Sequence, residues 1–229
     1  MPAVIMNSRF SGNRGGQGQT IWSNGGLSVN SSTFSNNGYA WNGNGGAIET
    51  WGSLNVVNST FAQNAGYHGG AIMMYNGTIA VTNSTFISHT AGISGGTLFL
   101  GTPGLSPSVR IVNTVISGGA PDNCDFPVLS LGGNADSGTT CGFNQPSDQS
   151  NANAQFQPLG NYGGAMVGFD GLTPLWTAPP VRGSPLIDAA LLATCPPTDQ
   201  RGVPRPLGAG CDIGAVEVRP PVFLPVIRR

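Results

Sequence analysis

The chain has 229 residues, including 36 glycines, and only 8% of its residues are charged, which leaves a formal net charge of −1. Its nine basic residues are all arginines, and they are scattered along the sequence. This argues against a nucleic-acid-binding surface, which needs clustered positive charge. The longest apolar run is too short to cross a bilayer, so no transmembrane segment is expected.

A short phrase recurs five times in the first half of the chain, most clearly as Leu-Asn-Val-Val-Asn-Ser-Thr-Phe at residues 54–61. Its copies follow one another at steps of 24, 27, 25 and 30 residues. The residues that close the copies are Phe10, Phe34, Phe61, Phe86 and Ile116. A repeat of this length with its own apolar positions indicates a solenoid, because each unit can bury its apolar face only against its neighbours.

Apolar residues alternate within each copy, and a period of two is typical of a β-strand. One aligned set is Ala3, Leu27, Leu54, Ile79 and Val109, and the set two residues later is Ile5, Val29, Val56, Val81 and Ile111. A second strand follows the Gly-Gly pairs, with the aligned residues Ile21, Ile48, Ile72 and Leu98. We therefore predict an all-β fold, a right-handed parallel β-helix of about five regular coils over residues 1–119.

Asparagine recurs three residues before the closing position of the phrase. The aligned residues are Asn7, Asn58, Asn83 and Asn113, with Ser31 in the remaining copy. Stacked amides can hydrogen-bond along the axis of stacked strands. We expect a structural ladder here rather than a functional site.

The four cysteines lie outside the repeats, as Cys124 with Cys141 and Cys195 with Cys211. Neither pair has the close spacing of a zinc site, and no histidine lies nearby. We predict two local disulfides, with buried free thiols as the alternative, and hence an oxidising, extracytoplasmic setting. No export signal precedes the first coil, so either the natural N-terminus has been removed or the chain is a mature fragment.

The repeat fails after about residue 117, and residues 120–218 are expected to form an irregular cap region that continues the solenoid. Three motifs end this region: Ser-Pro-Leu-Ile-Asp-Ala at 184–189, Asp-Gln-Arg-Gly at 199–202 and Asp-Ile-Gly-Ala-Val-Glu at 212–217. This ordered series, together with the Gly-Gly-Ala-Ile and Asn-Ser-Thr-Phe phrases, resembles bacterial choice-of-anchor Q domain proteins. These overlap the parallel β-helix and polymorphic outer membrane protein repeat families. The resemblance implies an exported, surface-associated solenoid and carries no established chemistry; Ala190 departs from it, because a glycine is more usual there.

Four of the ten carboxylates of the chain lie in the last part of this region. They could be interpreted as an active site, but carboxylates beside Pro and Gly turns usually accept hydrogen bonds from backbone donors, and Arg201 suits bidentate pairing with a carboxylate. We expect a structural role for Asp188, Asp199, Arg201, Asp212 and Glu217.

One column of side chains is a candidate binding surface. Strand alternation puts the column from Ile21 to Leu98 inside, so the residues that follow each member should point outward. They are Trp22, Glu49, Met73 and Phe99, here called the outer column. The irregular segment 120–178 could cover it; otherwise it could bind a sugar, a partner or another copy. Trp51 and Tyr75, near corners, could stack on sugar rings or simply pack.

Self-association is a second hypothesis. The first coil would leave unpaired strand edges, and residues 219–229 form a proline-rich apolar tail that could add to the edge of another copy. The candidate residues in the tail are Val222, Phe223, Leu224, Val226 and Ile227.

The sequence thus predicts an extracellular or cell-surface solenoid with a structural, adhesive or self-assembling role and no catalytic residues, metal site or cofactor. The candidate partners are another copy and surface glycans. A carbohydrate-active lyase or hydrolase, or a glycan-binding module, is the alternative. Glu49 is the only acid in residues 1–119, whereas a glycosidase needs two carboxylates; the acids between Asp122 and Asp170 could still fold back over the coils.

Overall fold

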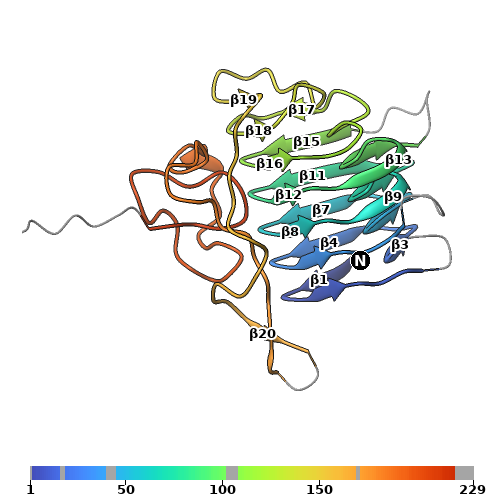
Figure 1. Ribbon diagram of the computed structural model, residues 1–229, viewed down its shortest axis with the longest axis horizontal. Helices are drawn as coiled ribbons and strands as arrows, with labels where there is room; N and C mark the ends of the chain where they lie inside the picture. The colour runs from blue at the N-terminus through green and yellow to red at the C-terminus, as the bar shows by residue number, and fades with distance from the viewer. Residues whose placement is uncertain (1, 16–18, 40–44, 102–107, 169–170, 220–229) are drawn as a thin grey trace, which may run out of the picture.

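The computed structural model describes residues 2–15, 19–39, 45–101, 108–168 and 171–219, and it is a right-handed parallel β-helix (Figure 1). Two long parallel sheets run the length of the stack. Sheet A consists of β1 (Ala3–Met6), β4 (Leu27–Asn30), β7 (Leu54–Val57), β11 (Thr78–Thr82), β15 (Ser108–Val112) and β17 (Leu129–Ser130). Sheet B consists of β2 (Arg9–Ser11), β5 (Thr33–Ser35), β8 (Thr60–Ala62), β12 (Thr85–Ile87), β16 (Val115–Ser117), β18 (Ala135–Asp136) and β19 (Gln149–Ser150).

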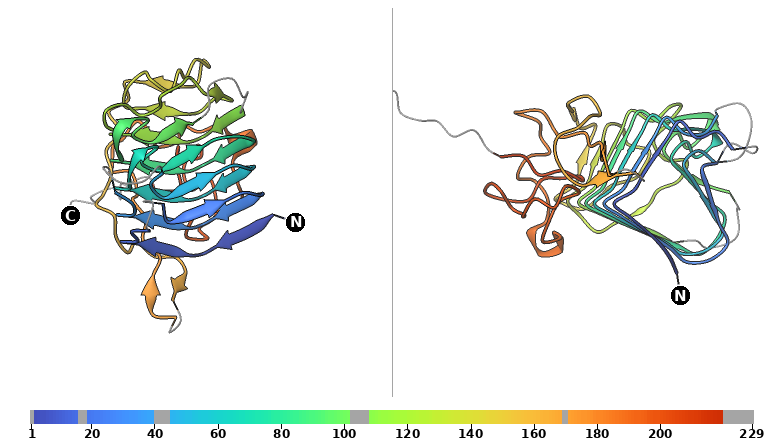
Figure 2. Two further views of the ribbon diagram at one scale, coloured as in Figure 1. Left: turned by 90° about the vertical axis from the view of Figure 1, so that its right-hand side faces the viewer. Right: turned by 90° about the horizontal axis from the view of Figure 1, so that it is seen from below.

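Two shorter parallel sheets complete the cross-section seen along the axis in Figure 2. Sheet C consists of β3 (Ile21–Ser23), β6 (Ile48–Thr50), β10 (Ile72–Met74) and β14 (Leu98–Leu100). Sheet D pairs β9 (Ala65–His68) with β13 (Thr90–Ser94). Outside the coils lie an antiparallel hairpin of β20 (Met166–Val167) and β21 (Thr173–Pro174) and one 3-10 helix, Leu192–Thr194.

The predicted repeat register is confirmed strand by strand. Phe10 pairs with Phe34, Phe34 with Phe61, Phe61 with Phe86, and Phe86 with Ile116. The four rings stack with centroids 4.8 Å apart, the spacing of the strands that carry them. Phe34, Phe61 and Phe86 are fully buried, so this ladder forms the centre of the core.

The expected amide ladder is largely absent, and the prediction of a continuous one is wrong. Asn113 donates to the side chain of Asn83, but Asn58 instead donates to the carbonyl of Thr198. All four asparagines, Asn7 included, have φ between 43° and 51°. Asparagine tolerates this left-handed conformation better than most residues. The backbone conformation of the corner between sheets A and B therefore explains asparagine at these positions, and side-chain stacking does not.

A true amide ladder lies one corner further along the coil. The side-chain amide of Asn13 donates to Oδ1 of Asn37, and the amide of Asn37 donates to Oδ1 of Asn64. His89 continues the column, where its Nδ1 accepts from the backbone N–H of Asn64. This second column supplies the axial hydrogen bonding that was expected at the first corner.

Beyond the regular coils the stack continues through β17, β18 and β19, and both predicted disulfides are confirmed. Cys124–Cys141 is buried and extends the core. The chain then runs back along the outer face of sheet B towards the first coil, where it forms the β20–β21 hairpin (Figures 1 and 2). The residues after the hairpin pack beside the stack. We call residues 151–219 the return segment.

The return segment bonds directly to successive coils. Thr33 donates to the carbonyl of Trp176, Thr60 donates to the side chain of Gln200, and Thr85 accepts from the backbone N–H of Ala215. These threonines precede the buried phenylalanines and therefore point outward from sheet B. Residues distant in sequence thus cover this face.

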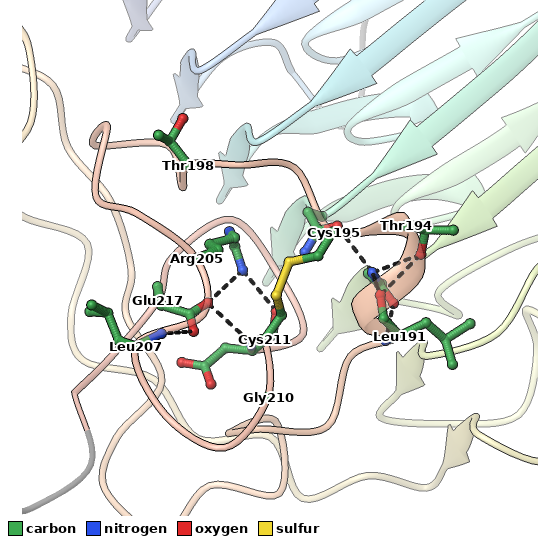
Figure 3. The surroundings of a disulfide bond; sticks show 12 residues. Leu191, Thr194, Cys195, Thr198, Arg205, Leu207, Gly210, Cys211 and Glu217 are labelled. Carbon is green, nitrogen blue, oxygen red and sulfur yellow. Dashed lines mark hydrogen bonds and ion pairs between the residues drawn. A yellow bond between two sulfur atoms is a disulfide. The ribbon is translucent and has the colours of Figure 1, made fainter.

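The terminal motifs hold the return segment together around the second disulfide, Cys195–Cys211 (Figure 3). Glu217 forms an ion pair of 2.9 Å with Arg205, and both side chains are fully buried. Glu217 also accepts from the backbone N–H groups of Leu207 and Asp212. The buried Arg205–Glu217 pair therefore organises this loop.

Asp199, Arg201 and Asp212 have similar local roles. Arg201 forms two side-chain hydrogen bonds to one oxygen of Asp199. Asp212 accepts from the backbone N–H groups of Asp188 and Val218, and burial raises its pKa to about 6. Asp188 accepts from the backbone N–H of Gly210. These contacts are those of structural side chains.

Candidate functional site

The outer column is aligned as the repeat predicts, on the outward side of sheet C. Trp22 pairs with Glu49, Glu49 with Met73, and Met73 with Phe99. The isolated bridge between Leu98 and Cys124 shows that Asp125 continues the column after Phe99. The sequence missed this member because the phrase that marks each coil is lost after residue 117.

Exposure along this column is uneven, which corrects the expectation that all four residues form an open strip. Trp22 is 55% exposed, whereas Glu49 and Met73 are only 5% and 3% exposed. Gly45 passes close beside this part of the column. A Cβ atom added to Gly45 would lie 3.2 Å from Cβ of Met73 and 3.3 Å from Cβ of Glu49. Backbone at the glycine corner thus crowds the middle of the column.

The segment 120–178 does not cover the outer column, so that hypothesis is wrong. Residues 120–150 continue the stack, while the described contacts of residues 151–178 with the coils are made on sheet B. Figure 2 shows the return segment on the opposite side of the solenoid from sheet C.

Trp51 and Tyr75 form a stacked pair directly after β6 and β10. Their ring centroids are 4.2 Å apart and their planes differ by 15°. Trp51 is 45% exposed. Gly101 takes the equivalent place in the next coil. The ring of Tyr75 lies close over it, since a Cβ atom added to Gly101 would be only 2.7 Å from Cε1 of Tyr75. We call Trp51 and Tyr75 the ring pair.

Glu49 connects the outer column with the ring pair. Its side chain bonds to Trp51, while burial raises its pKa. Burial, and after it the charge of Glu49, raise the pKa of Tyr75. The second carboxyl oxygen, Oε2, is buried without a hydrogen-bond partner. A buried polar atom of this kind is costly, and it lies below the surface, so a ligand hydroxyl could bond to it only after the side chains around it shift.

A second aromatic cluster packs on Phe99. The ring of His68 stacks on it at 4.2 Å, and Tyr67 contacts His68 edge-on at 4.9 Å. Burial lowers the pKa of His68, which favours the neutral imidazole. His68 directly precedes a glycine pair in the sequence, and nothing in that position indicates that β9 brings it beside Phe99.

The other predicted site residues lie elsewhere. The five tail residues, Val222, Phe223, Leu224, Val226 and Ile227, fall outside the described residues. Within the described part of the chain, no cluster of His, Cys, Asp and Glu could hold a metal ion.

Comparisons with family models, with curated proteins and with solved structures find no match for this chain. The family resemblance therefore depends on its motifs alone. In the residues that the structure describes, no helix is long and apolar enough to span a membrane.

Proposed function

We propose that the chain is an extracellular, surface-associated solenoid with an adhesive role, and that it binds glycans at the ring pair and the adjoining outer column. The observation that carries this proposal is the stacked, partly exposed Trp51 beside the unsatisfied Oε2 of Glu49. Aromatic faces and a few well-placed polar atoms are the usual components of a small-molecule site.

The arrangement suits a sugar ring in two ways. The exposed indole of Trp51 is a flat apolar surface held in place by Tyr75, so little side-chain entropy is lost when a ligand stacks on it. Once a ligand displaces the side chains over it, the unpaired oxygen of Glu49 can accept a hydrogen bond from a hydroxyl group. Together they provide stacking and one directional contact.

An extracellular setting is supported by the covalent structure. Both cysteine pairs form disulfides and no free cysteine is present, and disulfides persist in oxidising compartments. The resemblance of the terminal motifs to choice-of-anchor Q domain proteins supports the same location.

The geometry favours binding over cleavage. Asp125 is the next carboxylate along the outer column, with Met73 and Phe99 between it and Glu49. Three strand spacings of about 4.8 Å place the two positions about 14 Å apart. Glycosidases need carboxyl groups within about 10 Å of each other.

A glycan array followed by calorimetry on the best ligand tests the proposal. We expect Trp51→Ala to weaken binding about tenfold or more, which corresponds to about 1.4 kcal/mol, and Trp51→Phe to retain part of the affinity. Tyr162→Ala is the matched control, because Tyr162 is also a partly exposed aromatic residue but lies in the return segment.

Two results would contradict the proposal. One is the absence of any retained glycan, and the other is unchanged affinity of Trp51→Ala. Sugar products released by the native protein and lost in Glu49→Gln would instead favour the carbohydrate-active alternative.

A further inference from the structure

The acids of the outer column have no cationic partner among the described residues. Glu49 lies beside Trp51, to which its side chain bonds. Asp125 continues the column beyond Phe99 and is exposed, and one of its carboxyl oxygens accepts from the backbone N–H of Leu100. The ion pairs that the structure describes both lie in the return segment. The column thus carries negative charge that no side chain in the described part of the chain neutralises by direct pairing.

The arginines of the regular coils, three in number, lie elsewhere. The guanidinium of Arg9 lies over the ring of Trp176 in the return segment, and that of Arg14 lies over the ring of Tyr39. Arg110 lies in β15 of sheet A. The four strands of sheet C contain no basic residue. The charges of this sheet and of its outer column are therefore carboxylates alone.

The charge of Glu49 acts on the ring pair without a direct contact with a ligand. Glu49 is only 5% exposed, and its Oε2 has no hydrogen-bond partner. After burial, its negative charge is the second cause of the raised pKa of Tyr75. Coulomb interactions extend over several ångströms and are stronger where little water lies between the charges. A cation bound at the ring pair is therefore attracted by Glu49 even while the carboxylate stays below the surface.

The aromatic rings add to this attraction. Trp51 is 45% exposed and stacks on Tyr75. The face of an aromatic ring attracts a cation, and the indole ring of tryptophan does so most strongly. A buried carboxylate without a cationic partner is costly, and a ligand cation offsets part of that cost. Neutral sugars gain only the stacking, whereas acidic sugars are repelled by Glu49.

We propose that this site selects glycans that carry protonated amino groups, such as chains of unacetylated hexosamine. The inference rests on the proposed glycan-binding function and specifies the class of ligand. An ammonium group bound at the ring pair contacts the indole of Trp51 and lies within the field of Glu49. In a chain of such sugars that follows the outer column, a later ammonium group meets Asp125, about 14 Å from Glu49.

Calorimetry of the native chain with two matched oligosaccharides tests the ligand class. One is an oligomer of glucosamine at mildly acidic pH, where its amino groups are charged, and the other is its N-acetylated counterpart of the same length. We expect the charged oligomer to bind about tenfold more tightly. High salt should reduce this preference, because it screens the charges. An oligomer of uronic acid should bind more weakly than either.

Glu49→Gln removes the charge with little change in the size of the side chain. It should bring the affinities for the two matched oligomers to within about twofold of each other, whereas Trp51→Ala should weaken the binding of both. Glu49→Asp is the matched control, because it keeps the charge and should keep most of the preference. If Glu49→Gln does not fold, the salt dependence of the native preference decides.

Four results would each overturn this inference and leave the glycan-binding proposal standing. They are equal affinity of the native chain for the two matched oligomers, tighter binding of the N-acetylated or acidic oligomer, a preference that survives in Glu49→Gln, and a preference that high salt leaves unchanged. If the native chain bound neither these oligomers nor any glycan of the array, the proposed function itself would fail, and this inference with it.

Discussion

The regular coils and the return segment satisfy their buried polar groups in opposite ways. In the coils, a side chain accepts from the backbone N–H of the equivalent residue in the preceding coil: the N–H of Ser32 donates to Oγ of Ser59, and that of Ser59 to Oγ of Ser84. In the return segment, Glu217 accepts from three groups of one irregular loop, the side chain of Arg205 and the backbone N–H groups of Leu207 and Asp212. Stability is therefore distributed over repeated contacts in the coils and concentrated in a few side chains in the return segment.

The largest effect is expected where stability is concentrated. Arg205 donates to Glu217 and to the carbonyls of Asp212 and Gly214. Arg205→Met leaves a buried carboxylate unpaired, which should lower the free energy of unfolding by up to about 5 kcal/mol. Urea denaturation measures this change.

The double variant Arg205→Met with Glu217→Gln is its control. It should recover part of the loss, because no unpaired charge remains buried. If the single variant lowered the free energy of unfolding by less than about 1 kcal/mol, the Arg205–Glu217 pair would contribute no more than an exposed pair. That result would contradict the claim that stability is concentrated in a few side chains of the return segment.

A somewhat smaller effect is expected in the coils. Phe61 stacks on Phe34 and Phe86 and is fully buried, so Phe61→Ala should cost about 3 to 4 kcal/mol. Phe10 lies at the end of the ladder and is only partly buried, so Phe10→Ala should cost about half as much. Equal losses in thermal or urea unfolding would show that position in the ladder does not matter.

A third effect concerns pH and develops only below neutral pH. His89 is fully buried, and burial lowers its pKa to about 3. The unfolded chain binds this proton below about pH 6.5, so the contribution of His89 to stability is complete above that value and is lost as pH falls towards about 3. The expected slope is about 1.4 kcal/mol per pH unit.

His89→Asn tests this directly, because Asn37 and Asn64 occupy the same column. Unfolding free energies measured from pH 7 to pH 4 should fall less steeply in the variant than in the native chain. Parallel curves would mean that His89 is protonated in the folded state.

The same contrast explains how much the sequence could predict. The phenylalanine ladder and the alignment of Trp22, Glu49, Met73 and Phe99 follow from spacing alone, because each coil repeats the geometry of the last. The burial of Glu49 and Met73 could not be predicted, since it depends on the path of the glycine corner rather than on alternation.

The return segment was unpredictable for a different reason. Its contacts join residues about 140 positions apart, such as Thr60 and Gln200, and no periodicity marks them. Local motifs nevertheless indicated its structural carboxylates, because Asp and Glu beside Gly and Pro turns bind nearby backbone N–H groups. Local chemistry was thus visible in the sequence and long-range placement was not.

The path of the return segment also changes how the solenoid must come apart. Stacked repeats ordinarily lose structure one unit at a time from an end, because each contacts only its neighbours. Here the coils that contain Thr33, Thr60 and Thr85 are all bonded to a single crossing segment. Fraying of any one coil must break that crossing or carry the others with it, so the repeat array behaves as one cooperative unit.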